Sequence, residues 1–229
     1  MHATEMLKEI PLFKGLSDDT LSRLESAASV KRLEDGEVYL AAGQPPRAFC
    51  VVLSGQLKFY RVNKAGKEQV FGYARPQDVF GLTSLTDPHK ASHVDCQARI
   101  TTEVIEIELP VIREVMHREP ALAVAILKEQ SKRYSSMLDL VDQLSLKDAH
   151  NRLAKWLDSW IVLNHADSGE NELMIVLPYT QSEIAAQIGT VREVVSRGFS
   201  RMEKDGILKA SGKRVTILSR KRLRQMSES

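Results

Sequence analysis

The stretch "QSEIAAQIGTVREVVSRGFS", residues 181–200, decides how the C-terminal part of the chain folds. Gly189 separates two runs of apolar residues at helical spacing. Glycine tolerates the positive φ angle that a tight turn between the runs can require. Ala185 is small enough for two helices to cross closely. The expected buried positions are Ile184, Ile188, Val191, Val195 and Phe199. The pattern predicts a helix–turn–helix, in which a tight turn joins two steeply crossed helices.

Polar residues occupy the opposite side of the second predicted helix, close to its N-terminus. They are Arg192, Glu193, Ser196 and Arg197. In helix–turn–helix proteins this end reaches base edges in the major groove. Arginine suits O6 and N7 of guanine, and glutamate accepts from the amino group of cytosine. The alternative is a solvated helix face on which Glu193 pairs with Arg197 four residues later.

The C-terminal region is also basic and carries a further β signal. From Arg192 to Arg224 there are 11 Lys or Arg and 3 Asp or Glu, a net charge of +8, whereas the whole chain carries +2. This asymmetry is expected of a protein that binds phosphate backbones, and a solvated basic tail is the alternative. The segment "GILKASGKRVTILS", residues 206–219, predicts two strands joined at Ser211–Gly212, a small wing.

The first half of the chain reads as helix and then as strands. Ser17 is a plausible N-cap for a helix that begins with Asp18 and Asp19. From about residue 30 to 108, β-branched and aromatic runs alternate with turn signals such as Asp35–Gly36 and Ser54–Gly55. The runs are "VYLAAGQ", "AFCVVLSGQLKFYRV", "EQVFGYA", "DVFGLTSL" and "TEVIEIEL". Many short strands at such spacing predict an antiparallel sandwich or barrel.

A long helix is predicted from Pro120 to about Leu146, after a shorter helical stretch that Pro110 opens. Apolar residues repeat along it every 3.5 residues on average, which indicates a coiled-coil seam with a second helix. The seam residues are Ala123, Leu127, Gln130, Tyr134, Met137, Val141 and Leu144. The alternative is a helix facing the core of its own chain. Three apolar residues lie off the seam and are candidates to pack on the β domain: Ile126, Leu138 and Leu140.

Composition narrows the class of protein. The 229 residues are 43% hydrophobic and 27% charged, which fits a globular protein of one large or two modest domains. No apolar run reaches the roughly 18 residues of a membrane span, and the first residues lack the apolar core of a secretory signal. Cys50 and Cys96 form neither a disulfide framework nor a CxxC motif. We therefore expect a cytoplasmic protein.

The segment "VREVVSR" after "SEIAAQIG" resembles the recognition helix of the cAMP receptor protein/FNR (CRP/FNR) superfamily of bacterial transcription regulators. The family motif is an Arg-Glu pair, then Ser or Gly three residues after the Glu, then Arg, and all four positions match here. The resemblance covers nearly the whole chain, with a minor departure at Gln77, where the family usually has glycine. It implies an α+β fold: an N-terminal antiparallel β-roll sensor of the jelly-roll, cyclic-nucleotide-binding-like type (1–118), a dimerisation helix (119–146) and a winged helix–turn–helix (147–229).

The resemblance also implies a homodimer that binds double-stranded DNA at a two-fold symmetric site, under allosteric control, with RNA polymerase as a partner. The four matching residues would then read bases. The residues expected to contact backbone phosphates are Thr180, Gln181, Thr190, Arg201, Lys213 and Arg214.

The signal is the part of the function that the sequence leaves open. Family members that bind cAMP use a Gly-Glu pair and an Arg-Ser pair, and the matching places here hold Gly81-Leu82 and Ser92-His93. The carboxylate for the ribose and the guanidinium for the phosphate are missing, so we do not expect cAMP. Two distant cysteines cannot supply the four-cysteine ligand set of the iron–sulfur branch. The expected effector-pocket residues are Gly81, Leu82, Ser92, His93, Tyr134 and Met137.

Several alternatives remain for the sensor. His89 or His93 is a candidate haem ligand for sensing nitric oxide or carbon monoxide, and Cys96 is a candidate redox group. An organic effector, or none, is equally allowed. A cupin-type enzyme would need clustered His and Glu ligands, and no HxH spacing occurs, so no enzyme is expected. A remote alternative is an interaction protein that no longer binds DNA.

Overall fold

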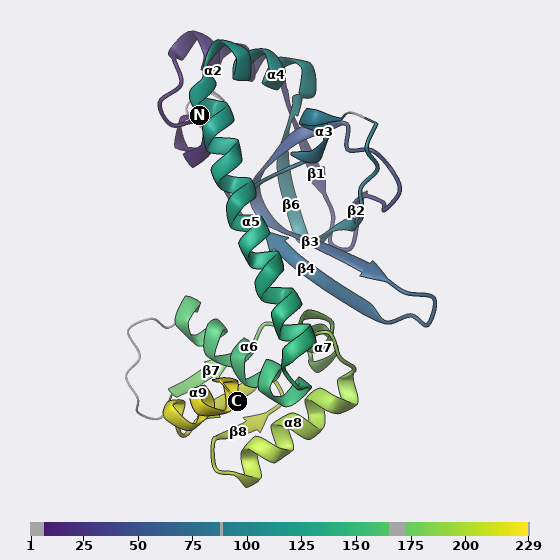
Figure 1. The fold of residues 1–229 in the computed structure, drawn as a ribbon, viewed down its shortest axis with the longest axis vertical. Coiled ribbons are helices and arrows are strands. Elements are labelled where there is room, and N and C mark those ends of the chain that lie inside the picture. The colour runs from purple at the N-terminus through teal and green to yellow at the C-terminus, as the bar shows by residue number, and fades with distance from the viewer. Residues whose placement is uncertain (1–6, 88, 165–172, 229) are drawn as a thin grey trace. The chain divides into compact units, whose positions relative to one another are not determined.

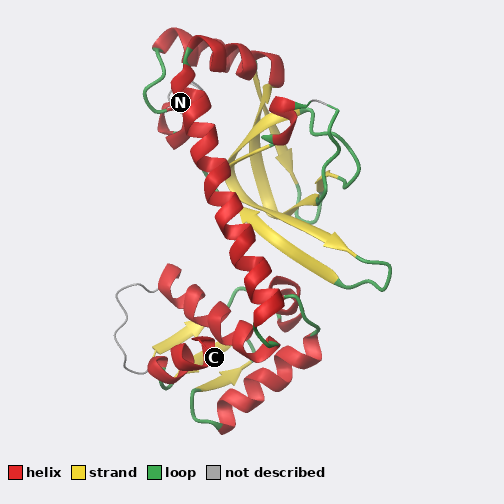
Figure 2. Ribbon diagram, in the orientation of Figure 1, coloured by secondary structure: helices red, strands yellow, loops and turns green. Residues whose placement is uncertain are grey.

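The computed structural model describes residues 7–87, 89–164 and 173–228 (Figures 1 and 2). The chain divides into two compact units, Met1–Arg61 with Phe71–Ser136, and Val62–Val70 with Met137–Ser229. The long helix α5 (Pro120–Leu146) contributes residues to both units and so is not a compact unit of its own.

The first unit is built on an antiparallel sheet with the strand order β1-β6-β3-β4, in which β2 also pairs with β6 and β5 with β3. The strands seen in the described residues are β1 (Ala28–Leu33), β2 (Val38–Leu40), β3 (Ala48–Val62), β4 (Glu68–Ala74), β5 (Val79–Phe80) and β6 (Asp95–Glu108). Because β3 and β6 are long and each pairs with several strands, the sheet forms the predicted roll.

Alternation along β3 separates two apolar cores. Phe49 and Val51 point to a core that also contains Ile112 and Ile126 from the helices, whereas Cys50 and Val52 point to a second core inside the roll. This alternation is the period-2 geometry of a strand buried on both faces. The helices that cover the first core are η1 (Pro11–Phe13), α2 (Asp18–Ser26), α3 (Thr83–Thr86), α4 (Leu109–Arg118) and the first part of α5.

The predicted N-cap of α2 is confirmed. The Ser17 hydroxyl accepts a hydrogen bond from the Thr20 amide at 3.3 Å and donates one to the Glu119 carboxylate at 2.6 Å. The Thr20 hydroxyl also donates to Glu119. These hydrogen bonds to the charged form lower the pKa of Glu119, with the Ser17 side chain as the largest cause.

Two local predictions in the β region are wrong. Ser54–Gly55 is not a turn, because β3 runs through it with a bulge in its pairing to β6. Gly55 has φ +83°, and a Cβ there would lie 2.4 Å from the Thr101 carbonyl oxygen, so glycine is required by close backbone approach. The end of "DVFGLTSL", expected as strand, forms the short helix α3.

The turn before β5 contains the residue that departs from the family pattern. The Asp78 amide donates to the Arg75 carbonyl at 2.9 Å, with Pro76 at the second position of the turn. Gln77 at the third position has φ +75°, the only non-glycine positive φ in the described residues. This is the arrangement of a type II turn, in which the third position favours glycine.

Helix α5 has the predicted bounds. Ile126 packs into the first core as expected, whereas Leu138 is 47% exposed and Leu140 is half-buried. None of the helices in the described residues is long and apolar enough to span a membrane.

The second unit combines helices with a small sheet of order β7-β9-β8. Its elements after α5 are α6 (Ala149–Asn164), β7 (Leu173–Val176), α7 (Gln181–Ile188), α8 (Arg192–Lys204), β8 (Leu208–Ser211), β9 (Arg214–Ile217) and α9 (Arg220–Glu228). The β8–β9 hairpin is the predicted wing, with Gly212 at φ +61° in its turn. Helix α9 was not predicted.

Candidate nucleic-acid interface

The first helix of the helix–turn–helix, α7, begins at a reciprocal cap. The Thr180 hydroxyl accepts from the Glu183 amide at 3.2 Å, and the Glu183 carboxylate accepts from the Thr180 amide at 2.6 Å. At the other end, Gly189 caps the helix with φ +70°, as its predicted place in the turn requires. The Thr190 amide then donates to the Ala185 carbonyl at 2.9 Å, which closes the turn.

The second helix, α8, buries one stripe of residues. These are Val195, Gly198, Phe199 and Met202. Val191 is 46% exposed, so the expectation that it is buried is wrong. The reason is local: Val191 is the N-cap of α8 and has an extended backbone, so the helical periodicity begins only after it.

Helix α8 crosses α6 closely at Gly198. A Cβ at this position would lie 2.7 Å from Cδ2 of Leu153, which is fully buried in α6. Ala185 is buried, as expected for a helix crossing, but the tight approach at Gly198 was missed. A glycine inside a helical pattern was the available signal.

The four candidate base-reading residues lie on the exposed side of α8. Arg192, Glu193, Ser196 and Arg197 fall within its first two turns, opposite the buried stripe. Within the described chain, no hydrogen bond or ion pair engages any of these four side chains. The alternative interpretation, a solvated face with a Glu193–Arg197 ion pair, therefore lacks its ion pair. Glu193 near the N-terminus is also compatible with the helix dipole.

The candidate phosphate-binding residues come from four places in the second unit: the start of α7, the turn, α8 and the wing. Thr180 is the N-cap of α7 and Gln181 is its first residue, while Thr190 lies in the turn. Arg201 is exposed on α8, 3.9 Å from Asp205. Lys213 and Arg214 are exposed at the tip of the wing. Helix N-termini, turn amides and basic wings are the usual donors to DNA phosphates.

Arg152 of α6 supports the turn, a role that sequence reasoning missed. Its Nε donates to the Ile188 carbonyl at 2.7 Å, and its Nη1 donates to the Lys147 carbonyl at 2.6 Å. Burial lowers the pKa of this guanidinium, although the group stays charged because its ordinary pKa is so high. Arg152 thus satisfies the carbonyl at the end of α7 and one just after α5 at the same time.

Part of the basic C-terminus is used within the fold. In α9, Leu223 and Arg220 are both buried, and the Arg220 guanidinium lies 3.5 Å from the Asp158 carboxylate. Arg224 lies at the same distance from Asp158. These two arginines, counted in the net charge of +8, hold α9 to α6, so the charge available to DNA is smaller than the sequence suggests.

Comparison with known proteins agrees with this geometry. Residues 30–119 match the cyclic nucleotide-binding domain family, and residues 151–226 match the Crp-like helix-turn-helix domain family. The transcriptional activator protein Anr of Pseudomonas aeruginosa is 30% identical over 186 residues, 81% of this chain and 75% of that protein. This chain belongs to the CRP/FNR family of transcription regulators. As a CRP/FNR protein with a helix–turn–helix, it is a DNA-binding regulator.

Other proteins are similar to this chain in sequence or in fold. The fumarate and nitrate reduction regulatory protein of Escherichia coli K12 is 26% identical over 213 residues, 93% of this chain and 84% of that protein. FixK2 from Bradyrhizobium japonicum has the same fold, with a TM-score of 0.72 and 24% identity over 88% of this chain and 98% of its own. A CooA mutant from Carboxydothermus hydrogenoformans gives a TM-score of 0.76 and 20% identity, covering 96% and 95% of the two chains.

The residues expected to form the effector pocket differ in exposure and in local contacts in this CRP/FNR protein. Leu82 is buried in the first core, and the Ser92 hydroxyl donates to the Val94 carbonyl at 2.7 Å. His93 is exposed, Tyr134 is 67% exposed and Met137 is 44% exposed. Gly81 has φ +81° and approaches the backbone of Ala48, where a Cβ would lie 2.4 Å from the carbonyl oxygen. Gly81 is thus explained by backbone packing.

Neither a haem ligand nor a reactive thiol emerges from the described residues. His89 and His93 are exposed loop residues, and haem needs an apolar cavity around its ligand, so the two histidines do not fit that cofactor. Burial raises the pKa of the Cys50 thiol to about 12 and also raises that of Cys96. A redox thiol reacts as its thiolate, so both cysteines have the properties of structural residues.

Proposed function

We propose that the protein is a homodimeric, sequence-specific DNA-binding regulator whose β-roll senses a signal other than cAMP. In this proposal residues 1–118 sense the signal, 119–146 join two copies and 147–229 bind DNA. One observation carries the proposal: four exposed side chains near the N-terminus of α8 have no partner within the described ranges, namely Arg192, Glu193, Ser196 and Arg197. A desolvated glutamate next to phosphates is costly unless it binds a base or orients an arginine, so this set suits base reading.

The apolar stripe on α5 supports the homodimer. Leu127 is 65% exposed, Tyr134 67% and Val141 50%, and Met137 and Leu144 continue the same stripe. Ala123 and Gln130, the remaining seam residues, are half-buried. A contiguous apolar stripe on a helix is favourable only when another surface covers it. A second copy of the same helix provides an identical stripe, as two-fold symmetry requires.

Dimerisation also explains how the recognition helices would be used. Two copies related by a two-fold axis present two α8 helices to successive major grooves, one helical turn of DNA apart. The operator would then be two-fold symmetric, and RNA polymerase would be the partner at the regulated promoter. Loss of cAMP binding is supported by Leu82 and Ser92, which offer neither the carboxylate nor the guanidinium that the nucleotide needs.

The test separates dimerisation from DNA reading. Leu127→Lys places a charge in the proposed seam, and we expect sedimentation to show monomers and gel shifts to show weakened binding to a selected operator. Ser135→Lys, on an exposed part of the same helix outside the seam, is the matched control and keeps the dimer. A Leu127→Lys protein that remains a dimer with full affinity contradicts the proposed seam.

A second experiment tests DNA recognition. We expect selection from random duplexes to yield a two-fold symmetric site, and addition of cAMP to leave the affinity for that site unchanged. Failure to enrich any sequence, with no salt-dependent binding to random DNA, contradicts the regulator and favours an interaction protein without a DNA-reading function.

A further inference from the structure

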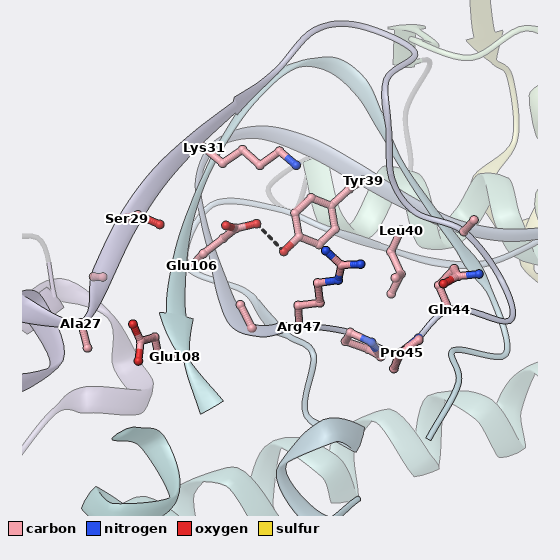
Figure 3. A pocket seen from close by; sticks show the side chains of 14 residues that line it. Ala27, Ser29, Lys31, Tyr39, Leu40, Gln44, Pro45, Arg47, Glu106 and Glu108 are labelled. Atoms are coloured by element: carbon pink, nitrogen blue, oxygen red, sulfur yellow. Dashed lines mark hydrogen bonds between the residues drawn. The ribbon is translucent and has the colours of Figure 1, made fainter. Parts of the chain in front are cut away.

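A cavity of about 610 Å³ opens at one end of the β-roll (Figure 3). Its walls come from the start of β1, the β2 region, the segment Gln44–Ala48 and the end of β6. This volume lies within the range of small-molecule sites. The six residues expected to form the effector pocket are not among its lining residues.

Strand register explains why this end of the roll is polar. Val104 of β6 lies between Lys31 and Val52, and two residues further along, Glu106 lies between Ser29 and Cys50. Residues two apart on a strand share a face, so the face that is apolar at Val104 becomes polar towards Glu106. The second core therefore ends where the cavity begins.

The cavity holds charges of both signs. Lys31 and Arg47 are cationic, and Glu106 and Glu108 are anionic. No ion pair involves any of these four side chains within the described parts of the chain. Figure 3 shows the side chains of Lys31 and Arg47 extending towards Tyr39, while both glutamates stand on β6. The cavity thus presents opposite charges that do not neutralise each other by direct contact.

One of the carboxylates is held in place. The Tyr39 hydroxyl donates to Glu106 at 2.7 Å and lies 2.9 Å from the Cys50 sulfur, and the Lys31 ammonium stands 5.0 Å from the centre of the Tyr39 ring. Tyr39 is itself part of the wall, so the hydroxyl that fixes Glu106 comes from the cavity surface. A pre-positioned carboxylate loses less entropy when it binds a cationic group.

We propose that this cavity binds a small zwitterion of amino-acid or dipeptide size. Its carboxylate would pair with Arg47 and Lys31, and its ammonium group would pair with Glu106 and Glu108. A simple anion meets two carboxylates and a simple cation meets two basic groups, so neither gains net attraction. A ligand with both charges satisfies both sets at once. This inference concerns the protein without DNA and does not rest on the proposed regulatory function.

The experiment uses the full chain and measures ligand-induced stabilisation and heats of binding. The probes are the common L-amino acids and their glycyl dipeptides at millimolar concentration, and we expect one or a few to bind and raise the unfolding temperature. The N-acetylated and C-amidated forms of each binding compound lack one charge and should bind at least about tenfold more weakly. Absence of binding by every probe, or equal binding of a form that lacks one charge, overturns the proposal.

Variants locate the site. Arg47→Ala and Glu106→Gln should each weaken binding at least about tenfold, whereas Arg61→Ala and Glu9→Gln, exposed and outside the cavity, should bind as the parent protein does. Arg47 is exposed and has no ion-pair partner among the residues that the structure describes, so its replacement tests binding without disturbing the core, and Arg47→Gln serves as a second variant. Unchanged binding in both Arg47 variants overturns the assignment.

Discussion

Thr180 and Glu183 cap α7 reciprocally: the amide of each residue donates a hydrogen bond to the side chain of the other. The Thr180 hydroxyl oxygen therefore already accepts a hydrogen bond within the fold. The Thr180 hydroxyl could still donate its proton to a DNA phosphate. The cap positions the start of the helix–turn–helix before any DNA is present.

Replacing Thr180 by Ala should destabilise the second unit by about 1 kcal/mol, because the Glu183 amide loses its acceptor. Chemical denaturation, monitored by the circular dichroism of the helices, measures the change in the free energy of unfolding. Thr180→Ser retains the oxygen and should recover most of the loss. Equal unfolding curves for the parent and Thr180→Ala proteins would show that the cap is not a stabilising contact.

Arg197→Ala should cost about 1–3 kcal/mol on the selected operator and relax its sequence preference, because a base contact is lost. Lys213→Ala, in the wing, should instead weaken binding to all duplexes alike and reduce the salt slope by about 1. Binding titrations at several salt concentrations on operator and random DNA distinguish the two. If Arg197→Ala lost affinity equally on both duplexes, its base-reading role would be wrong.

The contact between Glu119 and Ser17 predicts a pH-dependent contribution to stability. The pKa of Glu119 is lowered in the folded state, so its contribution is present above the unfolded pKa, about 4.3, and disappears as pH falls through the folded value. Glu119→Gln should thus destabilise the protein near neutral pH by about 1 kcal/mol, since solvent screens this half-exposed group.

The check is denaturation of both proteins across the acidic range. The difference between parent and Glu119→Gln should shrink as the pH falls, while Glu9→Gln, exposed and without a partner among the described residues, should show no such trend. A difference that stays constant with pH would assign the effect to packing.

Gln77 offers a substitution that should stabilise the protein. A non-glycine residue with φ +75° pays about 1–2 kcal/mol for the left-handed conformation, and glycine avoids this cost at the expense of a more flexible unfolded chain. Gln77→Gly should therefore raise the unfolding free energy by a few tenths to about 1 kcal/mol, and Gln77→Val should lower it. Thermal unfolding of the three proteins gives the order, and destabilisation by glycine would contradict the strain argument.

Sequence reasoning succeeded where local signals decide the structure. The Ser17 cap, the bounds of α5 and the wing all follow from capping residues, periodicity and turn residues, and each is present. The exposed position of the four candidate base-reading residues on α8 also followed from helical periodicity, once the turn was placed at Gly189.

Most of what sequence reasoning missed depends on tertiary contact, whereas the error at Val191 is local. Gly55 signals a turn locally, yet the backbone of Thr101 and Thr102 approaches it and makes it a bulge. The sequence of α9 is so polar that its burial depends on Leu223 and on the Asp158 ion pairs, which no local pattern reveals. The cavity charges come from β1, β6 and the segment before β3, so only the folded roll brings them together.

Arg152 has a mechanical consequence for the second unit. One planar guanidinium holds the carbonyl of Lys147, one residue beyond the end of α5, and the carbonyl of Ile188, the last residue of α7. The turn of the helix–turn–helix cannot tilt away from the last turn of the long helix without breaking one of these bonds. Within the second unit, a single side chain therefore ties the turn between α7 and α8 to the C-terminal end of the long helix, and Arg152→Ala would release both carbonyls at once.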